Sequence, residues 1–105
     1  MKMVRVYRNE DVRRIIAFIP KGHRHVRILL EFVDGAVVIQ EATAAAIVRA
    51  YMNVVTHPFK RAVELVSQRV SGQKEGYADY QLLETSRSEE EIFSQLESIL
   101  EPNKS

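Results

Sequence analysis

The segment VRILLEFVDGAVVIQEA, residues 26–42, decides the fold class of this chain. Two runs rich in valine, isoleucine, leucine and phenylalanine flank the dipeptide Asp34-Gly35, which is typical of a tight hairpin turn. We therefore expect two antiparallel strands joined by a two-residue type I′ loop, with Phe32 opposite Val37.

Side chains alternate between the two faces of such a hairpin. One face carries polar side chains such as Arg27, Glu31 and Gln40, and we expect it to be mostly hydrated. The other face is almost entirely apolar and needs a cover, which we expect helices to provide. This apolar face comprises Val26, Ile28, Leu30, Phe32, Val37 and Ile39.

The residues before the hairpin predict a strand and a helix. Val4 and Val6 alternate with polar residues, which indicates a short first strand. From Asn9 to Ile19 the apolar residues lie three or four apart, and Asn9 is a suitable N-cap. We therefore expect a helix here that Pro20 ends.

A long helical pattern follows the hairpin, from about Thr43 to Val70, and passes through Pro58. The apolar stripe keeps its phase across the proline, which favours one helix kinked at Pro58, at a cost of about 3 kcal/mol. The alternative is two helices that meet at Pro58, because His57 precedes proline and is biased away from helical angles. The stripe comprises Ile47, Tyr51, Val55, Phe59, Val63, Val66 and Val70.

The C-terminal part predicts a turn, a strand and a helix. Gly72 and Gly76 enclose the expected turn, and residues 77–85, YADYQLLET, are typical of a fourth strand. Ser88 and Glu91 have the spacing of a capping box, which predicts the start of a terminal helix. The buried stripe of that helix would comprise Ile92, Phe93, Leu96, Ile99 and Leu100.

These patterns together predict an α+β domain of two layers. An antiparallel sheet of about four strands would be covered on one face by helices, in the order β-α-β-β-α(kinked)-β-α. A length of 105 residues without an internal repeat or linker predicts a single domain over residues 1–105.

Composition limits the classes of function. The chain has no cysteine, which excludes disulfides, thiolate metal sites and a cysteine nucleophile. It has no apolar run of about 18 residues and no signal-peptide pattern, so we expect a cytoplasmic protein without a membrane span. Arginine outnumbers lysine, which is compatible with a thermophilic source.

The formal net charge of +1 hides a strong asymmetry along the chain. Residues 1–34 hold eight basic and four acidic side chains, a net of +4, whereas residues 71–105 hold three and eight, a net of −5. Segments of opposite sign can pair within the fold or between copies. The basic N-terminal third could also contact nucleic acid through Arg5, Arg8, Arg13, Arg14, Lys21, Arg24 and Arg27.

No motif predicts catalysis, a cofactor or a metal. The glycines are scattered and form no phosphate-binding loop. His23 and His25 could offer two metal ligands, but no third ligand is evident. The most organised polar surface is instead a stripe on the long helix, opposite the apolar one. We expect this stripe to bind a partner through Arg49, Asn53, His57 and Arg61.

The hairpin together with the following TAAAIVRAYMN, residues 43–53, resembles the small dimerisation subunit of KEOPS, the tRNA threonylcarbamoyladenosine modification complex. Arg49, Ala50 and Asn53 carry this resemblance, which covers about residues 4–57. Pro58 falls within the region that matches the long helix of the family, and residues 77–101 are additions to its pattern. The resemblance implies a homodimer that serves a larger, RNA-modifying complex.

Two classes of function therefore lead. The first is a non-enzymatic binding or assembly module, a homodimer that could be a subunit of a larger protein complex. The alternative is a nucleic-acid-binding protein that uses the basic N-terminal third. A small enzyme assembled across a dimer is a third class, which no motif supports. Salt separates the first two, because phosphate binding weakens steeply as salt rises.

Overall fold

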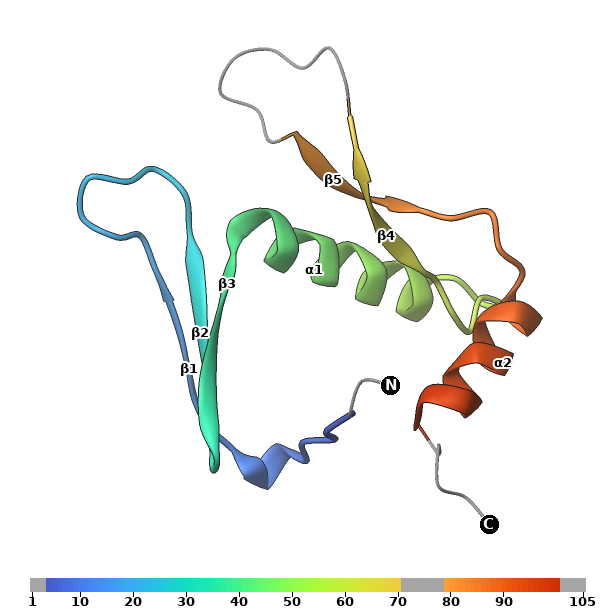
Figure 1. The fold of residues 1–105 in the computed structure, drawn as a ribbon, viewed down its shortest axis with the longest axis horizontal. Helices are drawn as coiled ribbons and strands as arrows, with labels where there is room; N and C mark the ends of the chain where they lie inside the picture. The colour runs from blue at the N-terminus through green and yellow to red at the C-terminus, as the bar shows by residue number, and fades with distance from the viewer. Residues whose placement is uncertain (1–3, 71–78, 101–105) are drawn as a thin grey trace. The chain divides into compact units, whose positions relative to one another are not determined.

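The computed structural model describes residues 4–70 and 79–100 and shows an α+β chain. The chain divides into two compact units, residues 1–45 and residues 46–105, here the N-terminal and C-terminal units. The boundary falls within helix α1 (Glu41–Thr56), the first of two α-helices in the described part of the chain (Figure 1). The α+β class is as predicted. The predicted single sheet of four strands is not found, because the described strands form one sheet of three and another of two.

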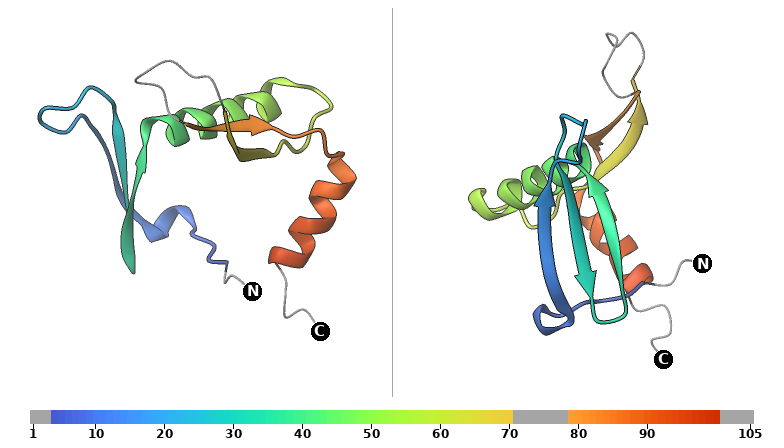
Figure 2. Two further views of the ribbon diagram at one scale, coloured as in Figure 1. Left: turned by 45° about the horizontal axis from the view of Figure 1, so that its top comes forward. Right: turned by 90° about the vertical axis from the view of Figure 1, so that its left-hand side faces the viewer.

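An antiparallel sheet makes up most of the N-terminal unit. Its strands are β1 (Val12–Phe18), β2 (Arg27–Phe32) and β3 (Gly35–Gln40), in the order β1-β2-β3. Figure 2 shows the three strands side by side, with β2 in the centre. The predicted hairpin is therefore the β2–β3 pair, which β1 extends by one strand.

Strand β1 replaces the helix that was predicted from Asn9 to Ile19. Among the described residues, a 3-10 turn, η1 (Asn9–Asp11), precedes the strand, and the short first strand predicted at Val4 and Val6 is not formed. The pairing of β1 with β2 is irregular between Val12 and Arg14, so that Val12 and Ile15 both lie on the face of their β2 partners. This irregularity gives a strand the three-residue spacing of a helix, which explains the error. Valine and isoleucine favour the strand once a partner is present.

The hairpin loop lies one residue earlier than predicted. Val33 and Asp34 form the turn, and Phe32 pairs with Gly35, so every cross-strand pair is shifted by two residues. A shift of two keeps each side chain on its face. The predicted apolar face is therefore confirmed for the residues of both strands: Ile28, Leu30, Phe32, Val37 and Ile39.

Strand β1 adds apolar side chains to both faces of the sheet. Ile15 and Ala17 join the predicted apolar face, whereas Ile16 and Phe18 lie on the face that was expected to be hydrated. That second face holds one ion pair, in which Arg14 Nε lies 2.6 Å from Glu31 Oε1. Apart from this pair, much of the second face is also apolar.

Helix α1 ends at Thr56, so neither predicted course of the chain through Pro58 is correct. The Thr56 hydroxyl donates to the Met52 carbonyl at 2.6 Å, which satisfies one acceptor in the last turn. Beyond Pro58 the chain forms a loop and then strand β4 (Leu65–Arg69). Val66, the β-branched residue of this strand, is compatible with it because β5 provides the pairing partner.

Strand β5 (Tyr80–Glu84) lies within the segment predicted as the fourth strand and pairs antiparallel with β4. The turn predicted around Gly72 and Gly76 lies outside the described residues. The terminal helix is confirmed as α2 (Glu89–Leu100). Its capping box is present: the Glu91 N–H donates to Ser88 Oγ, and the Ser88 N–H donates to Glu91 Oε1, both at 3.2 Å.

Candidate functional site

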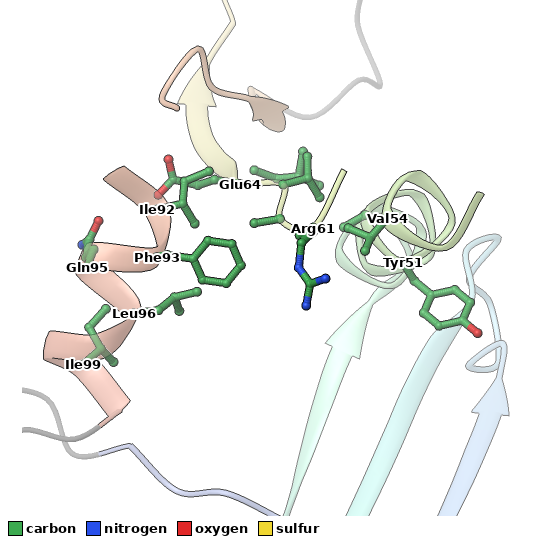
Figure 3. Close-up of a pocket in the computed structure, with 13 residues that line it drawn as sticks. Tyr51, Val54, Arg61, Glu64, Ile92, Phe93, Gln95, Leu96 and Ile99 are labelled. Carbon is green, nitrogen blue, oxygen red and sulfur yellow. The ribbon is translucent and has the colours of Figure 1, made fainter. Parts of the chain in front are cut away.

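A groove in the C-terminal unit lies between α1, residues 61–65 and α2 (Figure 3). Its volume is about 550 Å³, which is within the range of small-ligand sites. The predicted apolar stripe of α2 supplies one wall, where Phe93 and Leu96 point toward the loop that carries Arg61. Val54 of α1 lies on the opposite side. The groove is thus mainly apolar.

Ion pairs and hydrogen bonds hold one edge of this groove. Arg87 Nη1 donates to Glu64 Oε2 at 3.1 Å and to Gln95 Oε1 at 2.6 Å. The Thr85 hydroxyl donates to Glu64 Oε1 at 2.8 Å. Both oxygens of the half-buried Glu64 carboxylate therefore have partners, and this network joins residues before β4 to the start of α2.

Arg61 is the free cation of the groove among the described residues. Its backbone N–H donates to Glu89 Oε1 at 3.0 Å, which fixes the loop against the first turn of α2. No described acid forms an ion pair with its guanidinium, which extends into the groove (Figure 3). Apolar walls with one cation suit binding. Catalysis by acyl transfer requires a nucleophile beside a general base, and the residues that line this groove do not include such a pair.

The predicted partner-binding stripe does not exist as one helix face, because the helix ends before its third member. Arg49 donates to the Leu82 carbonyl at 3.1 Å. Asn53 accepts from Lys60 Nζ at 3.4 Å, and Lys60 also pairs with Glu84 at 3.2 Å. These bonds attach α1 to β5 within the unit.

The two remaining members of the stripe lie in the loop after α1. His57 is exposed at the end of the helix, and Arg61 lies at the groove. Of the predicted site residues, Arg61 lies at the groove, whereas Glu64 and Arg87, whose network holds one edge of the groove, were not predicted as site residues. The Glu64–Arg87 pair joins residues 23 positions apart, and no local spacing could indicate it.

The predicted nucleic-acid-binding residues all lie in the N-terminal unit, and three of the seven are paired with acids. Arg5 lies 3.1 Å from Asp34, Arg14 pairs with Glu31, and Arg8 lies 3.7 Å from Glu10. The other four form no ion pair with a described residue; they are Arg13, Lys21, Arg24 and Arg27. Pairing leaves less positive charge for phosphate than the sequence suggested.

In the histidine pair before β2, His25 contacts the carboxylate of Glu41. His25 Nδ1 lies 2.9 Å from Glu41 Oε2, and the Val26 N–H donates to Glu41 Oε1 at 2.8 Å. The Val26 bond first, and then His25, lower the pKa of the Glu41 carboxyl. Among the described residues, no group of three His, Asp or Glu side chains could hold a metal ion.

Comparisons with protein-family models, with curated proteins and with solved structures found no match to this chain. The resemblance to the KEOPS dimerisation subunit therefore stays a prediction that rests on residues of the hairpin and α1. None of the described helices has the length and apolar character needed to cross a membrane.

Proposed function

We propose that this chain is a non-enzymatic assembly module that associates with itself as a two-fold homodimer. We further propose that the homodimer is a subunit of a larger complex of the tRNA-modifying type, as the sequence resemblance implies. A two-fold dimer is the commonest closed assembly of identical chains.

The observation that carries this proposal is that almost none of the described side chains is fully buried. Among the described residues only Ala46 is buried, with 2% of its surface exposed. Large apolar side chains are exposed on β1, β3, β4, β5 and both helices. Soluble monomers rarely expose extended apolar patches, because covering apolar surface is favourable by about 25 cal/mol per Å². This surface supports a working state in which another protein surface covers it.

An apolar surface favours a protein partner over nucleic acid. Nucleic-acid interfaces are strongly basic and polar, whereas this chain exposes many large valine, isoleucine, leucine and aromatic side chains beside its charged ones. Three of the seven candidate basic residues are also neutralised within the chain. Nucleic-acid binding is therefore kept only as an outcome of the test below.

Light scattering over a wide concentration range, at low and high salt, tests the proposal. We expect a mass of twice 12.1 kDa that persists at high salt, because apolar contacts are not screened. A folded monomer at every concentration would refute self-association. Co-purified RNA that is lost as salt rises would instead support the nucleic-acid alternative. Mass spectrometry of co-purified proteins tests membership of a larger complex.

A further inference from the structure

The polarity of α1 is inverted relative to an ordinary surface helix. The side that faces the β4–β5 pair carries small and polar residues: Ala46 is buried, and Arg49 donates to the Leu82 carbonyl. On the same side Asn53 accepts from Lys60. An ordinary surface helix has its large apolar residues on the packed side and its polar residues outside.

The exposed side of α1 is apolar instead. Five large side chains on it are between 46% and 62% exposed. At about 100° per residue they lie within an arc of about 140° around the helix. We name this surface the outer face of α1; it comprises Ile47, Val48, Tyr51, Met52 and Val55.

The outer face also lacks charge. From residue 42 to the end of the helix, Arg49 is the only charged residue, and it lies outside the arc. A helix that works in water usually carries charged residues on its exposed side. Aromatic residues and methionine are enriched in protein interfaces, whereas lysine, glutamate and aspartate are depleted there, which matches the composition of the outer face.

An uncharged face suits a second copy of the same chain. At a two-fold contact each residue near the axis meets itself, so a charged residue there would face a like charge. A face of valine, isoleucine, methionine and tyrosine has no such conflict. A partner of different sequence would usually be selected by complementary charge, and the outer face offers none.

We infer that the outer face of α1 packs against the same face of α1 in a second copy. This inference rests on the proposed function, since it names the surface through which the homodimer forms. The two helices would bury Val55, which lies nearest the centre of the arc, with Val48 and Tyr51 on either side of it. Tyr51 also lines the groove of the C-terminal unit.

Substituting Val48→Glu tests the interface by placing two like charges at it. Glutamate is a better helix former than valine, so α1 itself should persist. We expect the dimer dissociation constant to rise by about tenfold or more. Ser94→Glu is the matched control, because it adds the same charge at an exposed position of α2 and should leave the dissociation constant unchanged. Circular dichroism confirms that both variants fold.

Single cysteines give an independent test, since the chain has no cysteine of its own. Val48→Cys, Tyr51→Cys and Met52→Cys each place one thiol on the outer face, and Ser94→Cys is the control. A disulfide requires Cα atoms about 4.4–6.8 Å apart. We therefore expect at least one outer-face variant to form the covalent dimer under mild oxidation about tenfold faster than the control.

The outcomes separate this inference from the proposed function. A dimer that Val48→Glu leaves intact, with no outer-face cysteine faster than Ser94→Cys, would overturn the inference and leave the homodimer standing. A wild-type chain that is monomeric at every concentration would overturn both. If Val48→Glu does not fold, the cysteine rates alone decide the question.

Discussion

Removing the Ser88 hydroxyl tests how much the N-cap stabilises α2. In Ser88→Ala the Glu91 N–H loses its acceptor at 3.2 Å, and this end of the helix gains an unpaired donor. Loss of a serine N-cap costs about 1 kcal/mol of stability. The reciprocal bond from the Ser88 N–H to Glu91 Oε1 uses the backbone and is retained.

Thermal unfolding followed by circular dichroism, at one fixed protein concentration, measures this effect. For a domain of this size, a loss of 1 kcal/mol lowers the midpoint by about 4–8 °C. Ser94→Ala is the matched control, because it removes the same hydroxyl from an exposed helix interior where alanine is preferred. A midpoint for Ser88→Ala at or above that of Ser94→Ala would refute the capping argument.

The same cap makes the stability of α2 depend on pH. The bond from the Ser88 N–H, then the Ser88 hydroxyl, and then the charge of Arg87 lower the pKa of the Glu91 carboxyl. A carboxyl whose pKa is lower in the folded state stabilises the fold above its unfolded pKa of about 4.3. That stabilisation is lost as pH falls through the folded value. The midpoint gap between wild type and Ser88→Ala should therefore narrow below about pH 4, and a constant gap from pH 7 to pH 3 would contradict this reasoning.

Three further predictions concern the N-terminal unit and the end of α1. Phe32→Ala should lower the free energy of unfolding in denaturant by about 2 kcal/mol, which is less than the loss at a fully buried phenylalanine. The ring is half-buried and stacks on Tyr7, with ring centroids 3.9 Å apart. A loss below about 0.5 kcal/mol would contradict this. Glu41→Gln should remove the part of acid sensitivity that arises from the lowered pKa of Glu41, so that its stability falls less than that of wild type between pH 5 and pH 3. Pro58→Ala should change stability by less than about 1 kcal/mol, since Pro58 lies beyond the helix end, and a gain of about 3 kcal/mol would instead indicate a proline inside a helix.

Sequence signals confined to a few neighbouring residues predicted the hairpin and the start of α2. The Ser88–Glu91 capping box spans four residues and appears with both of its hydrogen bonds. The hairpin at Asp34 was found with its faces correct and its register wrong by two residues, because alternation defines a face whereas the loop position defines the register. The α+β class followed from these elements.

Candidate site residues were predicted less well, because distant segments build the groove. Arg61 was identified through a helical spacing that does not exist beyond Thr56. The Glu64–Arg87 pair and the Lys60–Glu84 pair each join positions more than 20 residues apart. No periodicity connects such residues, and only pairing of β4 with β5 brings them together.

The sequence by itself determined that a hairpin forms around Asp34 and that a helix begins after Ser88, because an Asp-Gly pair and a serine N-cap act on their own backbone. Only the tertiary structure decided whether residues 12–18 and 65–69 were helix or strand. The apolar residues at these positions, such as Ile15 and Val66, are compatible with both periods, and an available partner strand selects one of them. Tertiary structure likewise decided which side of α1 is packed. Arg49 donates to the Leu82 carbonyl and Asn53 accepts from Lys60, so the polar side faces inward and the large apolar side chains remain outside.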